Sequence, residues 1–344
     1  MTEWKEYKLG EIVTFQRGHD LPKDKMIDGD IPVAGSNGII GYHNQFTKEG
    51  PGVTIGRSGN IGIPHYYPNA YWAHNTVLYV VDFKGNDAKF MYYLLKTFDF
   101  TQLNTGSAVP SLNRNHIHEL PVSIPDVPTQ HRIASILSSL DDKIDLLHRE
   151  NTTLEQMAET LFRQWFVVEA KEEWEDVLLG NLIDIGSGKG LQRSEFVENG
   201  LYSVLGANGD IGKTNKYLVD ESNRVIYTGR VGTLGNVFRL ENKKAWLSDN
   251  TLVIKPKEYY NFVYFVLKLS RLQDYNVGST QPLIRQSDIK EIELVLPDRG
   301  ILNAFEKECD LIYEKVENNN KQIQTLIQTR DGLLPRLMGG EVKL

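Results

Sequence analysis

The sequence predicts an α+β protein in which two pseudo-symmetric domains of mixed α/β structure are joined by two long antiparallel coiled-coil helices. Two observations lead to this prediction. The chain of 344 residues carries one block of sequence twice. Each copy is followed by a long stretch with the apolar periodicity of a coiled coil. We therefore expect a chain that runs domain, helix, domain, helix.

The duplication extends over most of each copy. The segment 104–125, NTGSAVPSLNRNHIHELPVSIP, is echoed by 276–297, NVGSTQPLIRQSDIKEIELVLP. The order of matching segments is kept, and the offset stays between 170 and 175 residues. A period of that length is too long for a solenoid repeat, so it indicates a duplicated domain. The matching segments include WKEYKLGEIVTFQRG with WEDVLLGNLIDIGSG, GSNGIIGY with GANGDIGK, IGRSGNIG with TGRVGTLG, and FMYYLLKTF with FVYFVLKLS.

The domain boundaries follow from these patterns. Short β-branched and aromatic runs between Gly, Asn and Pro turns predict strands, and one clear helix is expected in each copy. Duplication kept only for stability is one interpretation, and a long ligand with two half-sites is the other. We predict a first domain at 1–128, a central helix at 129–170, a second domain at 171–299, and a C-terminal helix and tail at 300–344.

The two helical stretches, about 129–168 and 301–337, carry apolar residues at alternating spacings of four and three. Such a rod is roughly 60 Å long and must bury its apolar stripe to be stable. The other helix is the nearest partner, and two-fold symmetry makes the pair antiparallel. The predicted seam contains Leu140, Ile144, Leu147, Asn151 and Leu154 in the first helix, and Ile312, Val316, Asn319, Ile323 and Leu326 in the second.

Two seam positions are polar, Asn151 and Asn319, and we expect them to fix the register at some cost in stability.

Pro335 interrupts the hydrogen bonding of the second helix, and Gly339–Gly340 ends it. The alternative is that each amphipathic helix packs only on its own domain.

No motif in the sequence predicts catalysis. GSGKG at 186–190 lacks the Ser or Thr and the earlier glycine of a phosphate-binding loop. Asp126, Asp141 and Lys143 imitate a nuclease motif, but the last two fall in the helical rod and are expected on a solvated face. Cys309 lies on the seam, where packing is the expected role.

A metal site is not predicted either. The pair His116 and His118 is replaced by Asp288 and Lys290 in the second copy. Because the side chains at these two positions differ between the copies, they indicate an exposed surface rather than a metal centre. With one cysteine there is no internal disulfide and no four-cysteine zinc site.

Candidate ligand-binding residues are bases in the glycine-rich loops. The chain is acidic overall, with a net charge of −7, so a nucleic acid would have to meet a local basic face. Arg57 and Arg230 hold the same place in GRSG and GRVG, where glycine lets a ligand approach and arginine can bind phosphate or guanine. The candidate DNA-binding residues are Arg17, Lys23, Arg57, Arg114, Lys189, Arg193, Arg230 and Arg285.

Three segments together resemble the specificity subunit of type I restriction-modification enzymes. They are PTQHRIASILSSLDDKIDLLHRENTTLEQMAETLFRQWF, GSTQPLIRQSDIKEIELVLP and LIQTRDGLLPRLMGGEV. The resemblance covers the whole chain, because that family also has the order domain, helix, domain, helix.

The resemblance implies a function. Each domain would be a target recognition domain that reads one half of a bipartite, asymmetric double-stranded DNA sequence. The helices would set the gap and dock two modification subunits, which carry S-adenosylmethionine. Restriction subunits are a further implied partner. The chain itself would bind no cofactor or metal and have no catalysis.

Two alternatives stay open from sequence: an enzyme that acts on DNA by itself, and a coiled-coil scaffold for proteins alone. The N-terminal residues are charged and no window of ~18 apolar residues exists, so neither a signal peptide nor a membrane span is predicted. A cytoplasmic location is therefore expected.

Overall fold

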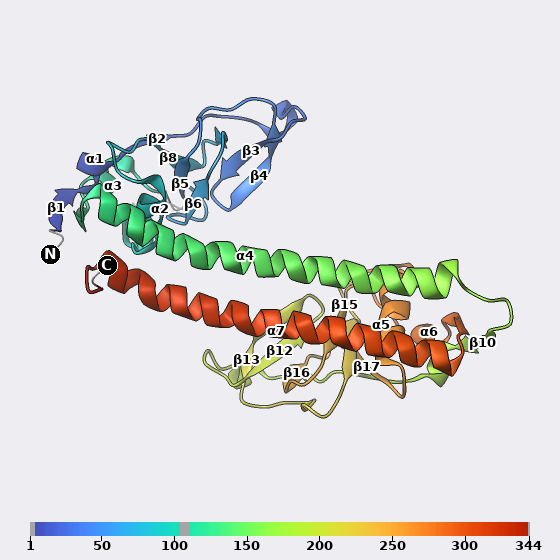
Figure 1. The fold of residues 1–344 in the computed structure, drawn as a ribbon. Coiled ribbons are helices and arrows are strands. Elements are labelled where there is room, and N and C mark those ends of the chain that lie inside the picture. The colour runs from blue at the N-terminus through green and yellow to red at the C-terminus, as the bar shows by residue number, and fades with distance from the viewer. Residues whose placement is uncertain (1–3, 104–110, 343–344) are drawn as a thin grey trace. The chain divides into compact units, whose positions relative to one another are not determined.

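The computed structural model describes residues 4–103 and 111–342, and Figure 1 shows their ribbon. The glycine turn and loop predicted at 104–110 lie outside the described residues. The chain divides into two compact units, one formed by 1–148 with 320–344 and the other by 149–319. Each unit therefore contains one mixed α/β domain and a part of each long helix. The long helices are α4 (Val127–Arg163) and α7 (Arg299–Met338).

The first unit contains a four-stranded antiparallel sheet in the order β2-β8-β5-β6 and a three-stranded sheet in the order β4-β3-β7. In the smaller sheet, β3 pairs with β7 in parallel. A two-stranded ladder, β1-β9, completes the unit. The strands are β1 (Lys5–Lys8), β2 (Thr14–Arg17), β3 (Ile31–Gly35), β4 (Gly38–His43), β5 (Gly52–Gly56), β6 (Pro64–Tyr67), β7 (Trp72–Ala73), β8 (Val77–Asp82) and β9 (Pro121–Ile124). The short helices are α1 (Leu9–Ile12), α2 (Ala88–Lys96) and α3 (Arg114–His118), with 3₁₀ turns η1 (Lys23–Lys25) and η2 (Phe100–Leu103).

The second unit repeats this topology strand for strand. Its sheets have the orders β11-β17-β14-β15, β13-β12-β16 and β10-β18. The strands are β10 (Glu175–Leu178), β11 (Ile183–Ser187), β12 (Tyr202–Gly206), β13 (Gly209–Thr214), β14 (Val225–Gly229), β15 (Val237–Leu240), β16 (Ala245–Leu247), β17 (Thr251–Pro256) and β18 (Glu293–Leu296). The helices are α5 (Tyr260–Leu269) and α6 (Gln286–Lys290), with η3 (Gln164–Val168), η4 (Leu179–Asn181), η5 (Arg193–Glu195) and η6 (Leu272–Tyr275). The predicted duplication of an α+β domain is confirmed.

The helix of each domain begins at a capped N-terminus. Asp87 precedes α2, and its side chain accepts a hydrogen bond of 2.6 Å from the Phe90 backbone N–H. The second copy has Tyr259 at this position, and the cap comes from α7 instead. The Glu306 carboxylate accepts from the backbone N–H groups of Asn261 and Phe262 at 3.1 and 2.8 Å. A carboxylate at a helix N-terminus satisfies unpaired donors and faces the positive end of the helix dipole.

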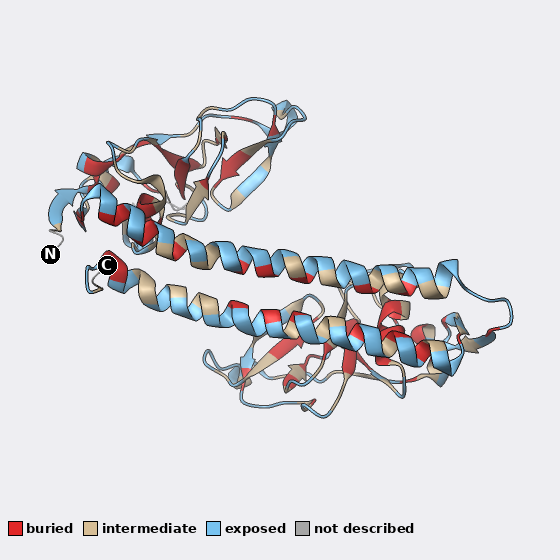
Figure 2. Ribbon diagram, viewed as in Figure 1, coloured by how far each residue is buried: buried red, intermediate tan, exposed pale blue. Residues whose placement is uncertain are grey.

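The two long helices pair within each unit, and their segments run antiparallel there. In the first unit Ile144 and Leu147 of α4 form a cluster with Ile323 of α7. In the second unit Phe162 of α4 packs against Phe305 of α7, with ring centroids 5.9 Å apart. Figure 2 shows buried positions recurring along both helices between exposed ones. The ten residues of the predicted seam are buried or half-buried.

The predicted polar seam pair meets directly. Asn319 Nδ2 donates a hydrogen bond of 2.9 Å to Asn151 Oδ1, and both side chains are buried. A polar pair in an apolar seam is satisfied in one alignment of the helices and unsatisfied in shifted ones. The pair therefore specifies the register of α4 against α7 in the second unit.

The end of α7 also follows the prediction. Pro335 lies inside the helix, which continues to Met338. Gly340 then adopts a left-handed backbone with φ of 71°. A left-handed glycine directly after a helix is a common way to end it.

Asp141 corrects one expectation from the sequence. We expected Asp141 on a solvated face of the long helix, but its carboxylate is half-buried between α4, α2 and α7. Tyr93 of α2 donates its hydroxyl to Asp141 Oδ2 at 2.6 Å, and Arg330 of α7 approaches Asp141 Oδ1 at 2.7 Å. The heptad pattern could not predict these contacts, because Tyr93 and Arg330 are distant from Asp141 in the sequence. Lys143 is exposed, as expected.

The second unit joins its domain to the helices with aromatic rings. Phe162 of α4 lies between Phe262 and Phe265 of α5, with centroid distances of 5.7 and 5.4 Å. Phe166 contacts Phe305 at 4.9 Å. Large buried aromatic side chains contribute most to the stability of such contacts. Across the described residues, no helix combines the length and apolar composition needed to cross a membrane.

Replacing Asn319 with leucine tests the polar pair. We expect Asn319→Leu to lower the free energy of unfolding by about 1–3 kcal/mol, because it removes a hydrogen bond to a buried amide. Chemical denaturation of the full chain measures this change. The exposed neighbour Asn318 gives the matched control, Asn318→Leu. Equal stability of the Asn319 and Asn318 variants would show that the buried pair contributes nothing.

Candidate nucleic-acid interface

Three of the four predicted basic residues of the first unit lie at one edge of its four-stranded sheet. Arg17 ends β2 and pairs with Leu78 of β8. Arg57 directly follows β5, whose last residue pairs with Val77 of β8. Because β8 lies between β2 and β5, both arginines emerge at the same edge. Burial, and to a lesser extent repulsion from Arg17, lowers the pKa of Arg57 from its ordinary value. Arginine titrates far above neutral pH, so the side chain stays charged.

Backbone hydrogen bonds hold the Arg57 loop. The Arg57 N–H donates to the Thr76 carbonyl at 2.8 Å, and the Leu112 N–H donates to the Arg57 carbonyl at 2.9 Å. The second bond brings the start of α3, with Arg114, beside Arg57. Asn113 caps this short helix by accepting from the Asn115 N–H. Arg17, Arg57 and Arg114 thus belong to one basic edge, which we call the first arginine edge.

Glycine is required before each arginine, because another part of the loop backbone passes very close to its Cα. A Cβ added to Gly56 would lie 1.9 Å from the Asn60 carbonyl oxygen, and one added to Gly229 would lie 2.0 Å from that of Thr233. The loop closes on itself at this point, with the Gly62 N–H donating to the Gly56 carbonyl at 2.8 Å. The two glycines therefore fix the loop from which Arg57 and Arg230 emerge.

The second unit builds the same edge with different side chains. The Arg230 N–H donates to the Asn250 carbonyl at 2.7 Å, and the Ile284 N–H donates to the Arg230 carbonyl at 3.0 Å. Arg285 follows directly and forms an ion pair of 3.6 Å with Asp288. Lys189 follows β11, and its N–H donates to the Leu247 carbonyl at 2.9 Å. Lys189, Arg230 and Arg285 form the second arginine edge.

Two predicted residues are not brought to these edges by any described contact. Lys23 lies in η1, and Arg193 lies in η5. Both turns are followed by segments that pack along the small sheets, as the bond of 3.0 Å from the Ile27 N–H to His43 Nδ1 shows in the first unit. Lys23 and Arg193 are exposed and occupy equivalent places in the two copies.

Sequence reasoning missed one residue in each copy that supports the arginine loop. Asn37 lies in the β3–β4 turn, and the Asn60 side-chain amide donates to its Oδ1 at 2.6 Å. Asn208 lies in the matching β12–β13 turn and donates to Thr233 Oγ1 at 3.0 Å. The repeated dipeptide Asn-Gly in SNG and ANG was the available signal. It predicts a hairpin turn, but not that the turn contacts the arginine loop.

Two side chains that were weighed for a metal site or for catalysis have structural contacts. His118 Nε2 accepts a hydrogen bond of 3.0 Å from the Phe15 N–H, and burial lowers the pKa of this imidazole. Cys309 is fully buried in the core of the second unit, and burial raises the pKa of its thiol to about 12. Within the described parts of the chain, no three His, Cys, Asp or Glu residues are grouped in a way that could hold a metal ion.

Comparison with known proteins assigns the chain to a class. The family model for the type I restriction modification DNA specificity domain matches residues 1–156 and again 171–326. The two matches cover most of the chain and correspond to the two copies. The chain therefore belongs to this family, whose members are the non-catalytic DNA-recognition subunits of restriction-modification complexes.

Individual relatives agree with this assignment. The chain is 26% identical to the type I restriction enzyme MjaIX specificity subunit of Methanocaldococcus jannaschii, over 76% of this chain and 70% of that protein. It is 23% identical to the type I restriction enzyme HindI specificity subunit of Haemophilus influenzae, over 99% of this chain and 100% of that protein. The crystal structure of a type I restriction-modification system S subunit from M. genitalium has the same fold. Its TM-score is 0.66 at 18% identity, over 98% of this chain and 96% of that one.

A substitution in one arginine edge tests its role in DNA binding. We expect Arg57→Ala to weaken binding to one half of the DNA target roughly 5- to 150-fold, as for the loss of one good base contact of about 1–3 kcal/mol. Binding would be measured with duplexes in which one half-site at a time is scrambled. Arg149→Ala, an exposed arginine of α4, is the control. Equal losses for the two half-sites would contradict the assignment.

Proposed function

We propose that each unit of this chain reads one half of a bipartite, asymmetric DNA sequence through its arginine edge. The observation that carries this proposal is the repetition of one edge on one topology. The backbone N–H and carbonyl groups of Arg57 and Arg230 make equivalent hydrogen bonds in the two copies. Arginine beside a close-approaching backbone suits both phosphate and guanine.

The asymmetry of the target is inferred from the side chains around the two edges. The position after the tight glycine is His19 in the first copy and Lys189 in the second. His74 of the first copy corresponds to Ser248 of the second. Arg17 of the first copy corresponds to Ser187 of the second. Different donors and acceptors on one frame select different base pairs.

The long helices are proposed to set the gap between the half-sites and to dock two modification subunits. These subunits would carry S-adenosylmethionine and methylate adenine, and restriction subunits would join the same complex. The partner subunits would supply contacts to the DNA phosphates. An acidic chain can therefore belong to a DNA-binding complex. A cytoplasmic location fits these partners and the single buried thiol.

Methylation-site sequencing tests the proposal as a whole. The chain and its modification subunit would be expressed separately and together in a host that lacks other adenine methylation. We expect a split, asymmetric motif that is methylated only when both proteins are present. Methylation that does not depend on this chain would contradict the proposal and favour a scaffold that binds proteins alone. A continuous motif would contradict the two half-sites.

Shortening both helices tests the proposed gap. Deleting 144–150 from α4 and 320–326 from α7 removes one heptad from each helix and keeps the Asn151–Asn319 pair. Seven helical residues span roughly 10 Å, so the gap should shorten by about three base pairs. Sequencing of the methylated motif measures the change, and insertion of one heptad in each helix should lengthen the gap. A gap that is the same in all three proteins would show that the helices do not set it.

A further inference from the structure

The turns that precede β8 and β17 each contact an arginine edge through the backbone. The Arg57 N–H donates to the Thr76 carbonyl at 2.8 Å, and the Arg230 N–H donates to the Asn250 carbonyl at 2.7 Å. Thr76 and Asn250 therefore hold the same place in the two copies. The residues directly before them also correspond, and they belong to the same two edges.

In the first unit this preceding residue is Asn75, which is half-buried. Its backbone carbonyl oxygen lies 3.5 Å from Arg57 Nη1, and its side-chain amide donates a hydrogen bond to Asp20 Oδ1. An asparagine amide has two N–H groups and one carbonyl oxygen. Within the described residues, Asn75 makes no other side-chain hydrogen bond. Asp20 thus holds the amide and leaves one donor and one acceptor available to a ligand.

The second unit carries a different pair at these two positions. Gly190 takes the place of Asp20, and Asp249 takes the place of Asn75. A Cβ added to Gly190 would lie 3.4 Å from Asp249 Oδ2, so the two positions adjoin in this copy as well. Asp249 is exposed, and its side chain makes no ion pair or hydrogen bond with the part of the chain that the structure describes. Its carboxylate oxygens can accept hydrogen bonds but not donate them.

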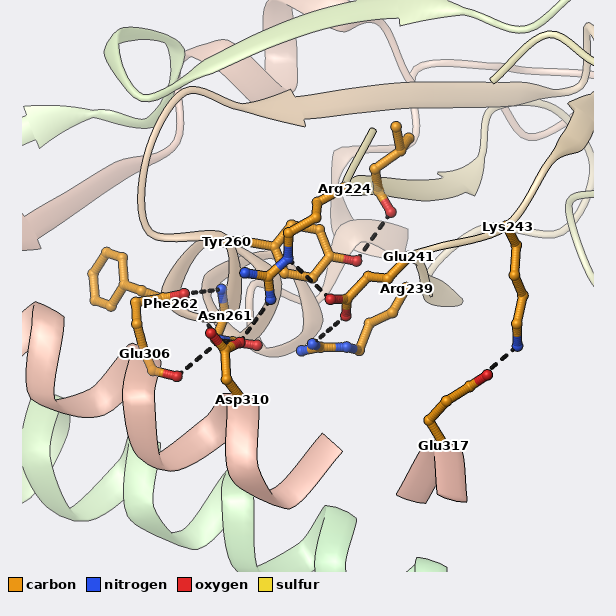
Figure 3. Close-up of polar contacts among 11 residues, drawn as sticks. Arg224, Arg239, Glu241, Lys243, Tyr260, Asn261, Phe262, Glu306, Asp310 and Glu317 are labelled. Atoms are coloured by element: carbon orange, nitrogen blue, oxygen red, sulfur yellow. Dashed lines mark hydrogen bonds and ion pairs between the residues drawn. The ribbon is translucent and has the colours of Figure 1, made fainter. Parts of the chain in front are cut away.

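Charged side chains that join the second domain to α7 are paired within the fold, unlike Asp249. Figure 3 shows Arg224 between Glu241 and Asp310, at 2.9 and 2.8 Å. Packing of the domain therefore does not account for the carboxylate of Asp249. At an edge that binds DNA, a carboxylate repels the phosphates. It contributes favourably only where it accepts a hydrogen bond from the amino group of a base.

The two side chains match different base edges in the major groove. Adenine presents an amino group beside the N7 acceptor, and an asparagine amide binds both groups at once. Cytosine presents an amino group and no neighbouring acceptor, and a carboxylate accepts from that amino group. A carboxylate that faced adenine would also meet N7, and two acceptors repel each other.

We propose that Asn75, oriented by Asp20, reads an adenine in one half-site and that Asp249 reads a cytosine in the other. The inference rests on the proposed function and names one base in each half of the target. It also gives a reason for glycine at position 190. An aspartate there, as in the first copy, would place a second negative charge beside the Asp249 carboxylate.

Exchange of the two pairs tests the inference. The double variant Asp20→Gly/Asn75→Asp gives the first unit the pair of the second, and Gly190→Asp/Asp249→Asn does the reverse. Each full chain would be expressed with its modification subunit, and the methylated motif would be sequenced. We expect the first variant to change one position of one half-site from adenine to cytosine, and the second to change one position of the other half-site from cytosine to adenine. Each preference should shift roughly 5- to 150-fold. Asn318→Asp, at an exposed position of α7, is the control and should keep the motif.

Binding of each complex to duplexes that carry each base pair at the changed position gives a second measurement, which does not require methylation. An unchanged split motif in either exchanged chain would overturn the inference and leave the proposed function intact. So would a change to any other base pair. Loss of binding to all of these duplexes at an unchanged thermal midpoint would show that the pair supports the edge and does not read a base. If the unaltered chain and its modification subunit yield no split motif, the proposed function fails together with this inference.

Discussion

The burial of the apolar stripes of α4 and α7 against each other is the constraint on which the other features depend. Neither helix can be stable as an isolated rod in water, so each needs the other along its length. Within each unit the domain then packs on a surface made by both helices. The Asn151–Asn319 pair adds specificity to this nonspecific attraction. Apolar seams tolerate a shift by one heptad, whereas a buried amide pair does not.

The residues that stabilise the fold differ from the candidate residues for DNA recognition. The sheets and the helices carry the buried residues, while the residues of the arginine edges lie at or just after the ends of β2, β5, β11 and β14 and at the starts of α3 and α6. Both copies keep the glycine before the arginine and the backbone hydrogen bonds of the arginine itself, and they differ in the neighbouring side chains. Selection on a duplicated domain with two different ligands would produce this pattern.

Much of this arrangement could be predicted from the sequence because it depends on periodic or repeated patterns. The heptads predicted both helices and the two seam asparagines, and the duplication predicted equal topology. The environment of Asp141 could not be predicted, since it depends on Tyr93 and Arg330 from two distant elements. Asn37 and Asn208 were missed for the same reason. The roles of the candidate arginines in DNA binding remain a prediction, because the fold places them but does not include DNA.

The way the Arg57 and Arg230 loops are held has a consequence for how this protein can evolve. Their main supports are backbone hydrogen bonds and a closely packed glycine, so the shape of the loop does not depend on most of the side chains it presents. Under the proposed function, a single substitution at such a position would change which bases are read and leave the free energy of folding nearly unchanged. New preferences would then arise one half-site at a time, on a frame that does not have to be rebuilt.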